Sequence, residues 1–90
     1  MSINLEAAIA FSPLHRLQWE EAQQKHVILY PEGMVELNAT AAEILQLCNG
    51  QHTLHDIVTL LEQKFETSGL ESDVREMLEA ALKNGWIKQN

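Results

Sequence analysis

The chain has 90 residues, of which 13 are acidic and 6 are basic, giving a formal net charge of −7. This length suffices for one small domain with a thin hydrophobic core. An acidic surface repels phosphate backbones, so binding to nucleic acid is disfavoured. A basic protein or peptide is the better electrostatic match. The same negative charge is equally explained by a role in solubility.

Residues 1–14 form an N-terminal arm whose structure the sequence leaves open. Leu5 to Phe11 fits a short helix ended by Pro13. The same residues equally fit a mobile arm, or an apolar arm that packs on a second copy of the chain as a homodimer. The arm has no basic start, and its short apolar run contains Glu6. We therefore expect no signal peptide, no membrane span and a cytoplasmic location.

Three strands are predicted after this arm. Residues 16–20 alternate between apolar and polar side chains, which is typical of a strand with one buried face. Residues 25–30 include four consecutive apolar residues, which indicates a central strand covered on both faces. The tetrapeptide Tyr-Pro-Glu-Gly then fits a tight turn, and residues 34–37 form the third strand. In a meander of this order the third strand lies at an edge of the sheet.

Three helices are predicted to follow, over about residues 38–50, 53–65 and 72–85. Asn38 and Thr40 are equally suited to begin the first helix, Thr53 opens a capping box for the second, and Ser72 caps the third. The order of elements predicts an α+β fold. It consists of a three-stranded antiparallel sheet followed by three helices in a winged helix-turn-helix-like arrangement.

The sequence lacks the patterns that catalysis and metal binding require. Cys48, His52 and His55 lie close together, but their spacing matches no zinc signature and a fourth ligand is missing. Cys48 is the single cysteine, so no intramolecular disulfide can form, and a buried thiol is a poor nucleophile. There is no glycine-rich phosphate loop and no nucleophile elbow. We expect no enzyme activity, no cofactor and no metal.

The edge strand is the stronger functional feature, because it presents unpaired backbone groups to which an extended peptide can add as a further strand. The third helix would form the second wall of such a groove. The candidate peptide-binding residues are Val35, Glu36, Leu37, Val74, Met77, Leu78 and Ala81. Met77 has a flexible side chain that suits an adaptable contact. Glu36 also fits the alternative role of a charged residue that prevents this edge strand from pairing with other chains and aggregating. Leu37, Val74 and Leu78 equally suit a purely structural place in the core.

A winged-helix DNA-binding regulator is the alternative function for this order of elements. Recognition of a duplex requires basic residues on the second or third helix. These helices offer only Lys64, Arg75 and Lys83, among several acidic residues. The sign of the charge therefore makes DNA binding the weaker hypothesis.

The sequence resembles the pyrroloquinoline quinone (PQQ) biosynthesis protein D family, PqqD. The residues that carry the resemblance are Arg16, Leu29-Tyr30-Pro31-Glu32, Leu37-Asn38, Thr40-Ala41, Ile44-Leu45-Gln46-Leu47-Cys48, Gly50, Ile57 and Asp73-Val74. The resemblance runs from about Leu14 to Ile87, and the Tyr-Pro-Glu turn and the Leu-Cys-x-Gly helix end are its most specific parts. Asn49 stands where many relatives have aspartate, which removes one charge and leaves the assignment intact.

The resemblance implies that residues 15–90 are a peptide-recognition domain. Members of the family bind a short precursor peptide and present it to a radical S-adenosylmethionine enzyme, which cross-links a glutamate to a tyrosine of that peptide. The domain itself performs no chemistry and holds no iron–sulfur cluster. In related recognition elements the peptide lies as an added strand between the third strand and the third helix. On this chain the added strand would lie along Val35 to Leu37 and face the third helix.

Overall fold

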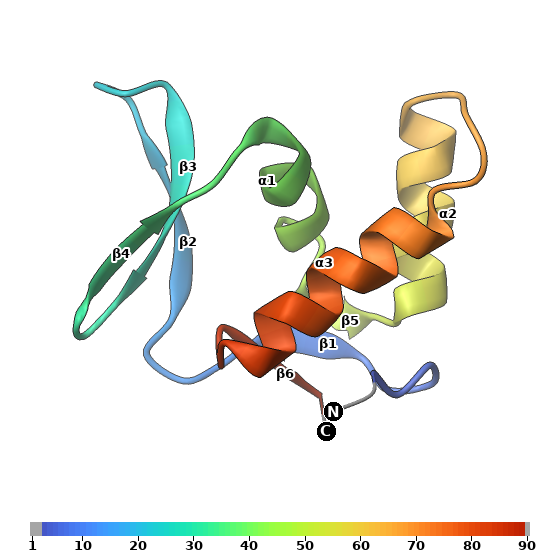
Figure 1. The fold of residues 1–90 in the computed structure, drawn as a ribbon, viewed down its shortest axis with the longest axis horizontal. Coiled ribbons are helices and arrows are strands. Elements are labelled where there is room, and N and C mark those ends of the chain that lie inside the picture. Colours follow the sequence, from blue (N-terminus) through green and yellow to red (C-terminus); the bar gives the residue numbers. More distant parts are fainter. Residues whose placement is uncertain (1–2, 90) are drawn as a thin grey trace.

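The computed structural model describes residues 3–89, which form six strands and three helices in the order ββββαβααβ (Figure 1). The elements in chain order are β1 (Ile9–Phe11), β2 (Arg16–Glu20), β3 (Lys25–Tyr30), β4 (Gly33–Glu36), α1 (Ala39–Leu45), β5 (Asn49–His52), α2 (Leu54–Lys64), α3 (Glu71–Lys83) and β6 (Ile87–Gln89). Within the described residues, no helix is both long enough and apolar enough to cross a membrane.

The first sheet has the order β2-β3-β4 and is antiparallel throughout. A two-residue turn joins β3 to β4, because Tyr30 pairs with Gly33. Val27 and Ile28 in β3 are both fully buried, as expected for a central strand. The predicted α+β class, with this sheet followed by three helices, is confirmed.

A second antiparallel sheet, with the order β5-β1-β6, was not predicted from the sequence. The short helix considered for Leu5 to Phe11 is wrong, because residues 5–7 form a turn and a bend and Ile9–Phe11 form the central strand of this sheet. Ile9 is fully buried and pairs with both neighbouring strands. The missed strands are only three or four residues long, so they show almost no alternation, and their partners are distant in the chain.

The described part of the N-terminal arm is held against the C-terminal strand. Gln89 Nε2 donates to the carbonyl oxygens of Asn4 and Ala7 at 2.7 and 2.9 Å, and Asn4 N donates to Gln89 Oε1 at 2.8 Å. Ile3 is also part of the core. Residues 1 and 2 of the predicted arm lie outside the described residues, and exchange of the arm between two copies stays a prediction.

The helix starts are fixed by hydrogen bonds that differ in origin. Asn38, and not Thr40, caps α1, because its side chain accepts from Ala41 N at 2.7 Å. The predicted capping box of α2 is present between Thr53 and Asp56. The predicted Ser72 cap of α3 is wrong, since α3 begins at Glu71 without a side-chain cap of its own.

Candidate functional site

The outer edge of β4 carries backbone groups that point away from the sheet. Leu37 N donates to His26 O at 3.0 Å, just past the end of β4, so the backbone of Leu37 faces β3. In an antiparallel pair this orientation alternates along the strand. The N–H and C=O groups of Val35 therefore face β3, whereas those of Met34 and Glu36 face the free edge.

The two faces of β4 are different in chemistry. Val35 lies opposite the buried Ile28 and packs, partly buried, against the hydrophobic core. Met34 and Glu36 lie on the other face, where the Glu36 carboxylate accepts from Lys25 Nζ at 3.3 Å. Of the β4 residues, Val35 is thus the one whose side chain lies on the helical side of the sheet.

The inner face of α3 is part of the core. Val74 is 2% exposed, and Leu78 and Ala81 are fully buried. Met77 is only partly buried and lies against the same cluster. The helix packs on α1, α2 and β6, and Figure 1 shows it running below α1 towards β6.

The seven predicted peptide-binding residues therefore divide into two sets. Leu37, Val74, Leu78 and Ala81 belong to the hydrophobic core and support the surface from beneath. Val35 and Met77 are partly buried, and Glu36 is exposed. A partner on this surface would contact the second set directly, together with the outward backbone of β4.

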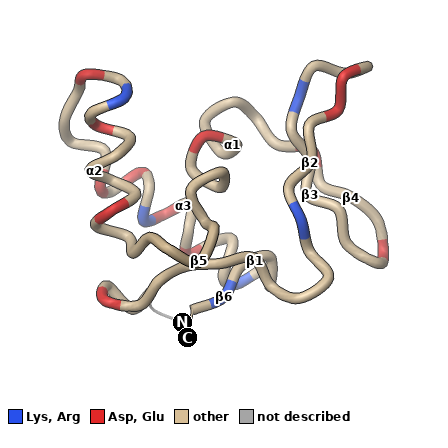
Figure 2. The backbone as a smooth tube through the Cα atoms, turned by 180° about the vertical axis from the view of Figure 1, so that it is seen from behind, with Lys and Arg blue, Asp and Glu red and all other residues tan. Residues whose placement is uncertain are grey.

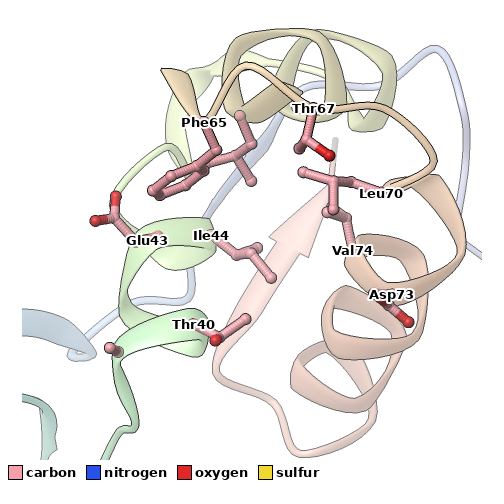
Figure 3. Close-up of a pocket in the computed structure, with 10 residues that line it drawn as sticks. Thr40, Glu43, Ile44, Phe65, Thr67, Leu70, Asp73 and Val74 are labelled. Atoms are coloured by element: carbon pink, nitrogen blue, oxygen red, sulfur yellow. The ribbon is translucent and has the colours of Figure 1, made fainter. Parts of the chain in front are cut away.

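An apolar pocket of about 400 Å³, which the sequence did not predict, lies between the start of α1, the end of α2 and the start of α3 (Figure 3). Its lining residues are Ala39, Thr40, Glu43, Ile44, Leu61, Phe65, Thr67, Leu70, Asp73 and Val74. Phe65 follows the last residue of α2 as its C-cap and is 51% exposed. The sequence signal was the pair of apolar residues, Phe65 and Leu70, on either side of a polar loop.

An ion pair holds one rim of this pocket. Lys64 Nζ lies 2.6 Å from Glu43 Oε1 and 5.5 Å from the centre of the Phe65 ring. The contact joins the end of α2 to α1. Because the pair is solvent-exposed, it contributes only a little to stability, but it orders the side chains at the rim.

The candidate chemical groups have structural roles. Cys48 is buried in the core, and burial raises the pKa of its thiol to about 12. Such a thiol stays protonated and unreactive near neutral pH. Among residues 3–89, no three His, Cys, Asp or Glu side chains are placed to hold a metal ion.

The helices of the winged arrangement are acidic. Figure 2 shows Asp and Glu residues along α2 and α3, with few basic residues among them. The acidic residues are Asp56, Glu62, Glu71, Asp73, Glu76 and Glu79, and the basic ones are Lys64, Arg75 and Lys83. A phosphate backbone would be repelled by these surfaces, which opposes the DNA-binding alternative.

The chain has close relatives among characterised proteins. It is 63% identical to a PqqA binding protein of Methylococcus capsulatus, over 99% of this chain and 96% of that protein. It is 49% identical to a PqqA binding protein of Klebsiella pneumoniae, over 88% of this chain and 87% of that protein.

Two solved structures share the fold. The solution structure of the PqqD part of Methylobacterium extorquens PqqCD has a TM-score of 0.79 at 25% identity, covering 97% of this chain and 95% of that one. It is described as a stand-alone recognition element for ribosomally synthesised and post-translationally modified peptides. The heterocyclase TruD has a TM-score of 0.71 at 21% identity over 93% of this chain and 12% of its own, which shows a shared fold alone.

The family described as Coenzyme PQQ synthesis protein D (PqqD) matches residues 25–87, which include β4, all three helices and every predicted peptide-binding residue. The chain is also 63% identical to a relative over almost its whole length, and the two findings together establish the family. The chain belongs to the PqqD family.

Proposed function

We propose that this chain is a non-enzymatic peptide chaperone of PQQ biosynthesis, which binds a PqqA-type precursor peptide and presents it to a radical S-adenosylmethionine enzyme. The proposal is supported by relatives named PqqA binding protein and by the structural likeness to a peptide-recognition element. The peptide adds to β4 as a fourth strand of the first sheet.

The observation that carries this mechanism is the outward orientation of the Met34 and Glu36 backbone groups. Two residues with free N–H and C=O groups offer up to four hydrogen bonds to an extended peptide, whatever its side chains. Val35 and Met77 then contact the peptide side chains that face the helices. Specificity comes from these contacts, and the backbone bonds supply register and affinity.

Presentation requires a second surface for the enzyme. A peptide held on a domain that also binds the enzyme is at a raised effective concentration at the active site, without any chemistry by the domain. The acidic faces of α2 and α3 are our candidates for this contact, since their charge suits a basic partner surface.

The proposal is tested by isothermal titration calorimetry of the chain with a synthetic PqqA peptide, with and without the partner enzyme. Saturable binding near one to one is expected. Val35→Lys and Met77→Glu should each weaken binding by about tenfold or more, because a charge would be placed against apolar peptide side chains.

Leu60→Lys is the matched control, since Leu60 is an exposed apolar residue of α2 away from β4. Circular dichroism of each variant shows whether it is folded. If folded Val35→Lys and Met77→Glu bind like the wild type, the peptide does not lie on this surface. Absence of any binding by the wild-type chain, with or without the enzyme, would contradict the chaperone function itself.

A further inference from the structure

The pocket between α1, α2 and α3 is apolar in its depth and open to solvent. Ile44, Leu61 and Val74 form its floor and are each at most 3% exposed. In Figure 3 the Ile44 side chain points across the pocket towards Val74, with Phe65 on the α2 side. The apolar surface that faces water lies mainly at the rim, where Phe65 is 51% exposed, and covering it with another apolar group is favourable.

The size of the pocket suits one large side chain. Its volume of about 400 Å³ exceeds that of engineered apolar cavities of roughly 150 Å³ that bind benzene. Phe65 is half exposed at the rim, where it can close over an inserted group. The ion pair between Lys64 and Glu43 joins the end of α2 to α1 beside this ring.

The pocket is continuous with the β4 edge along the chain. Ala39 and Thr40, which line it, follow Glu36 by only three and four residues. A strand rises by about 3.3 Å per residue, so these separations span at most about 10 to 13 Å. Val74 lines the pocket and also belongs to the α3 face expected beneath the peptide. A peptide paired with β4 therefore reaches the pocket within a few residues of its paired segment.

The charged residues of the lining select for one sign. Glu43 is acidic but its charge is compensated by Lys64, so Asp73 is the lining carboxylate that has no ion pair among residues 3–89 and keeps the rim net negative. The chain as a whole carries −7. A Lys or Arg beside the inserted side chain would therefore be attracted to the rim, and an Asp or Glu there would be repelled.

We propose that this pocket is a subsite for one large aliphatic or aromatic side chain of the bound peptide, next to a basic residue, and that Phe65 sets its specificity. The inference rests on the proposed function, because the occupant is part of the peptide that adds to β4. It goes further in assigning a role to residues outside β4 and the middle of α3. The apolar contact supplies affinity, and the acidic rim orients the neighbouring basic residue.

A double-mutant cycle between peptide and chain tests this subsite. The probe is a synthetic PqqA peptide in which each large apolar residue is replaced by alanine in turn. One replacement should weaken binding to the wild-type chain by about tenfold, as expected for a buried anchor. The same replacement should change binding to Phe65→Ala by less than about twofold, because the partner contact is already lost.

Two further variants keep the test independent of Phe65. Thr67→Trp fills the pocket from its exposed wall and should weaken binding of the unaltered peptide, whereas Leu60→Ala removes an exposed apolar group of α2 that does not line the pocket and should bind normally. Nuclear Overhauser effects between the anchor side chain and the methyl groups of Ile44 and Val74 should appear in the complex.

The failure of the subsite and the failure of the proposed function give different results. If the peptide binds, Val35→Lys weakens it, and yet the cycle shows no coupling and the methyl contacts are absent, the subsite is wrong and strand addition stands. If the wild-type chain binds no peptide, both proposals are overturned.

Discussion

Single side chains that accept hydrogen bonds from backbone N–H groups determine where the helices of this domain begin. Asn38 and Thr53 act within the segments that they cap, and both are recognisable in the sequence. The start of α3 is different, because Glu62 Oε2 of α2 accepts from Leu70 N at 3.0 Å. Ser72 is a residue type that often caps helices and lies close to the start of α3. The acceptor at this helix start is instead the Glu62 carboxylate of the neighbouring helix α2.

The capping carboxylate of Asp56 should make the stability depend on pH. A hydrogen bond from the Thr53 backbone, with smaller help from the Thr53 hydroxyl and from His52 and His55, holds the pKa of Asp56 below its ordinary value. Because the folded pKa is lowered, this stabilisation is complete above the unfolded pKa of about 3.9 and is lost as the pH falls through the folded pKa. Thermal unfolding should show a smaller loss of stability for Asp56→Asn than for the wild type between about pH 6 and pH 3.

Glu32→Gln is a suitable control, since it removes one carboxylate from an exposed turn. Its stability should follow the wild-type pH profile. Equal profiles for the wild type and Asp56→Asn would show that the capping box does not carry the pH dependence.

At the scale of the elements, β4 combines a paired side and a free side. The same strand must stay attached to β3 and offer its other edge to a peptide. The alternation of backbone direction allows both. The N–H and C=O groups of Val35 face β3, whereas those of Met34 and Glu36 face the free edge. The ion pair of Glu36 with Lys25 lies on the face away from the helices.

This division predicts different effects of proline at neighbouring positions. Glu36→Pro removes an N–H that points out of the sheet, so it should weaken PqqA binding by about fivefold or more, the cost of roughly one hydrogen bond, while the domain stays folded. Titration calorimetry and circular dichroism measure the two quantities.

Glu36→Ala is the control for loss of the carboxylate and its ion pair, and it should bind nearly as well as the wild type. Val35→Pro, in contrast, removes an N–H that faces β3 and should destabilise the sheet. Normal binding by folded Glu36→Pro would mean that the peptide does not pair with the outer edge of β4 at this residue.

At the scale of the whole molecule, both sheets and all three helices share one hydrophobic core. Ile9 of β1, Ile28 of β3, Leu45 of α1, Ile57 of α2 and Leu78 of α3 are all fully buried in one cluster. A domain of this size with a single core is expected to unfold in one cooperative transition.

The two tryptophans allow this cooperativity to be measured in separate parts of the molecule. Trp19 lies in β2 of the first sheet, and Trp86 precedes β6 of the second. In Trp19→Phe and in Trp86→Phe, the fluorescence of the remaining tryptophan should change at the same denaturant concentration as the far-ultraviolet circular dichroism of that variant. An earlier fluorescence transition of Trp19 would show that the first sheet unfolds on its own.

The sequence by itself determined the first sheet, the presence and order of the three helices, the free edge at the third strand and the family, although the first helix ends at Leu45 and the predicted helix end at Gly50 lies in β5. These features depend on neighbouring residues: alternation over 16–20, the turn after Tyr30, the caps at Asn38 and Thr53, and a local motif. Such short-range patterns involve neighbouring residues in the chain, so they can be recognised without knowledge of the fold.

Only the tertiary structure decided the second sheet, the cap of α3, the pocket and the accessibility of the predicted site. β1 pairs with strands about 40 and 80 residues further along the chain, and such non-local pairing of short strands leaves little trace in the sequence. The same holds for the site, since Val74 and Met77 are both apolar residues of α3 with helical spacing. Whether such a residue fills the core or meets a peptide depends on which elements pack against it, and packing is a property of the assembled fold.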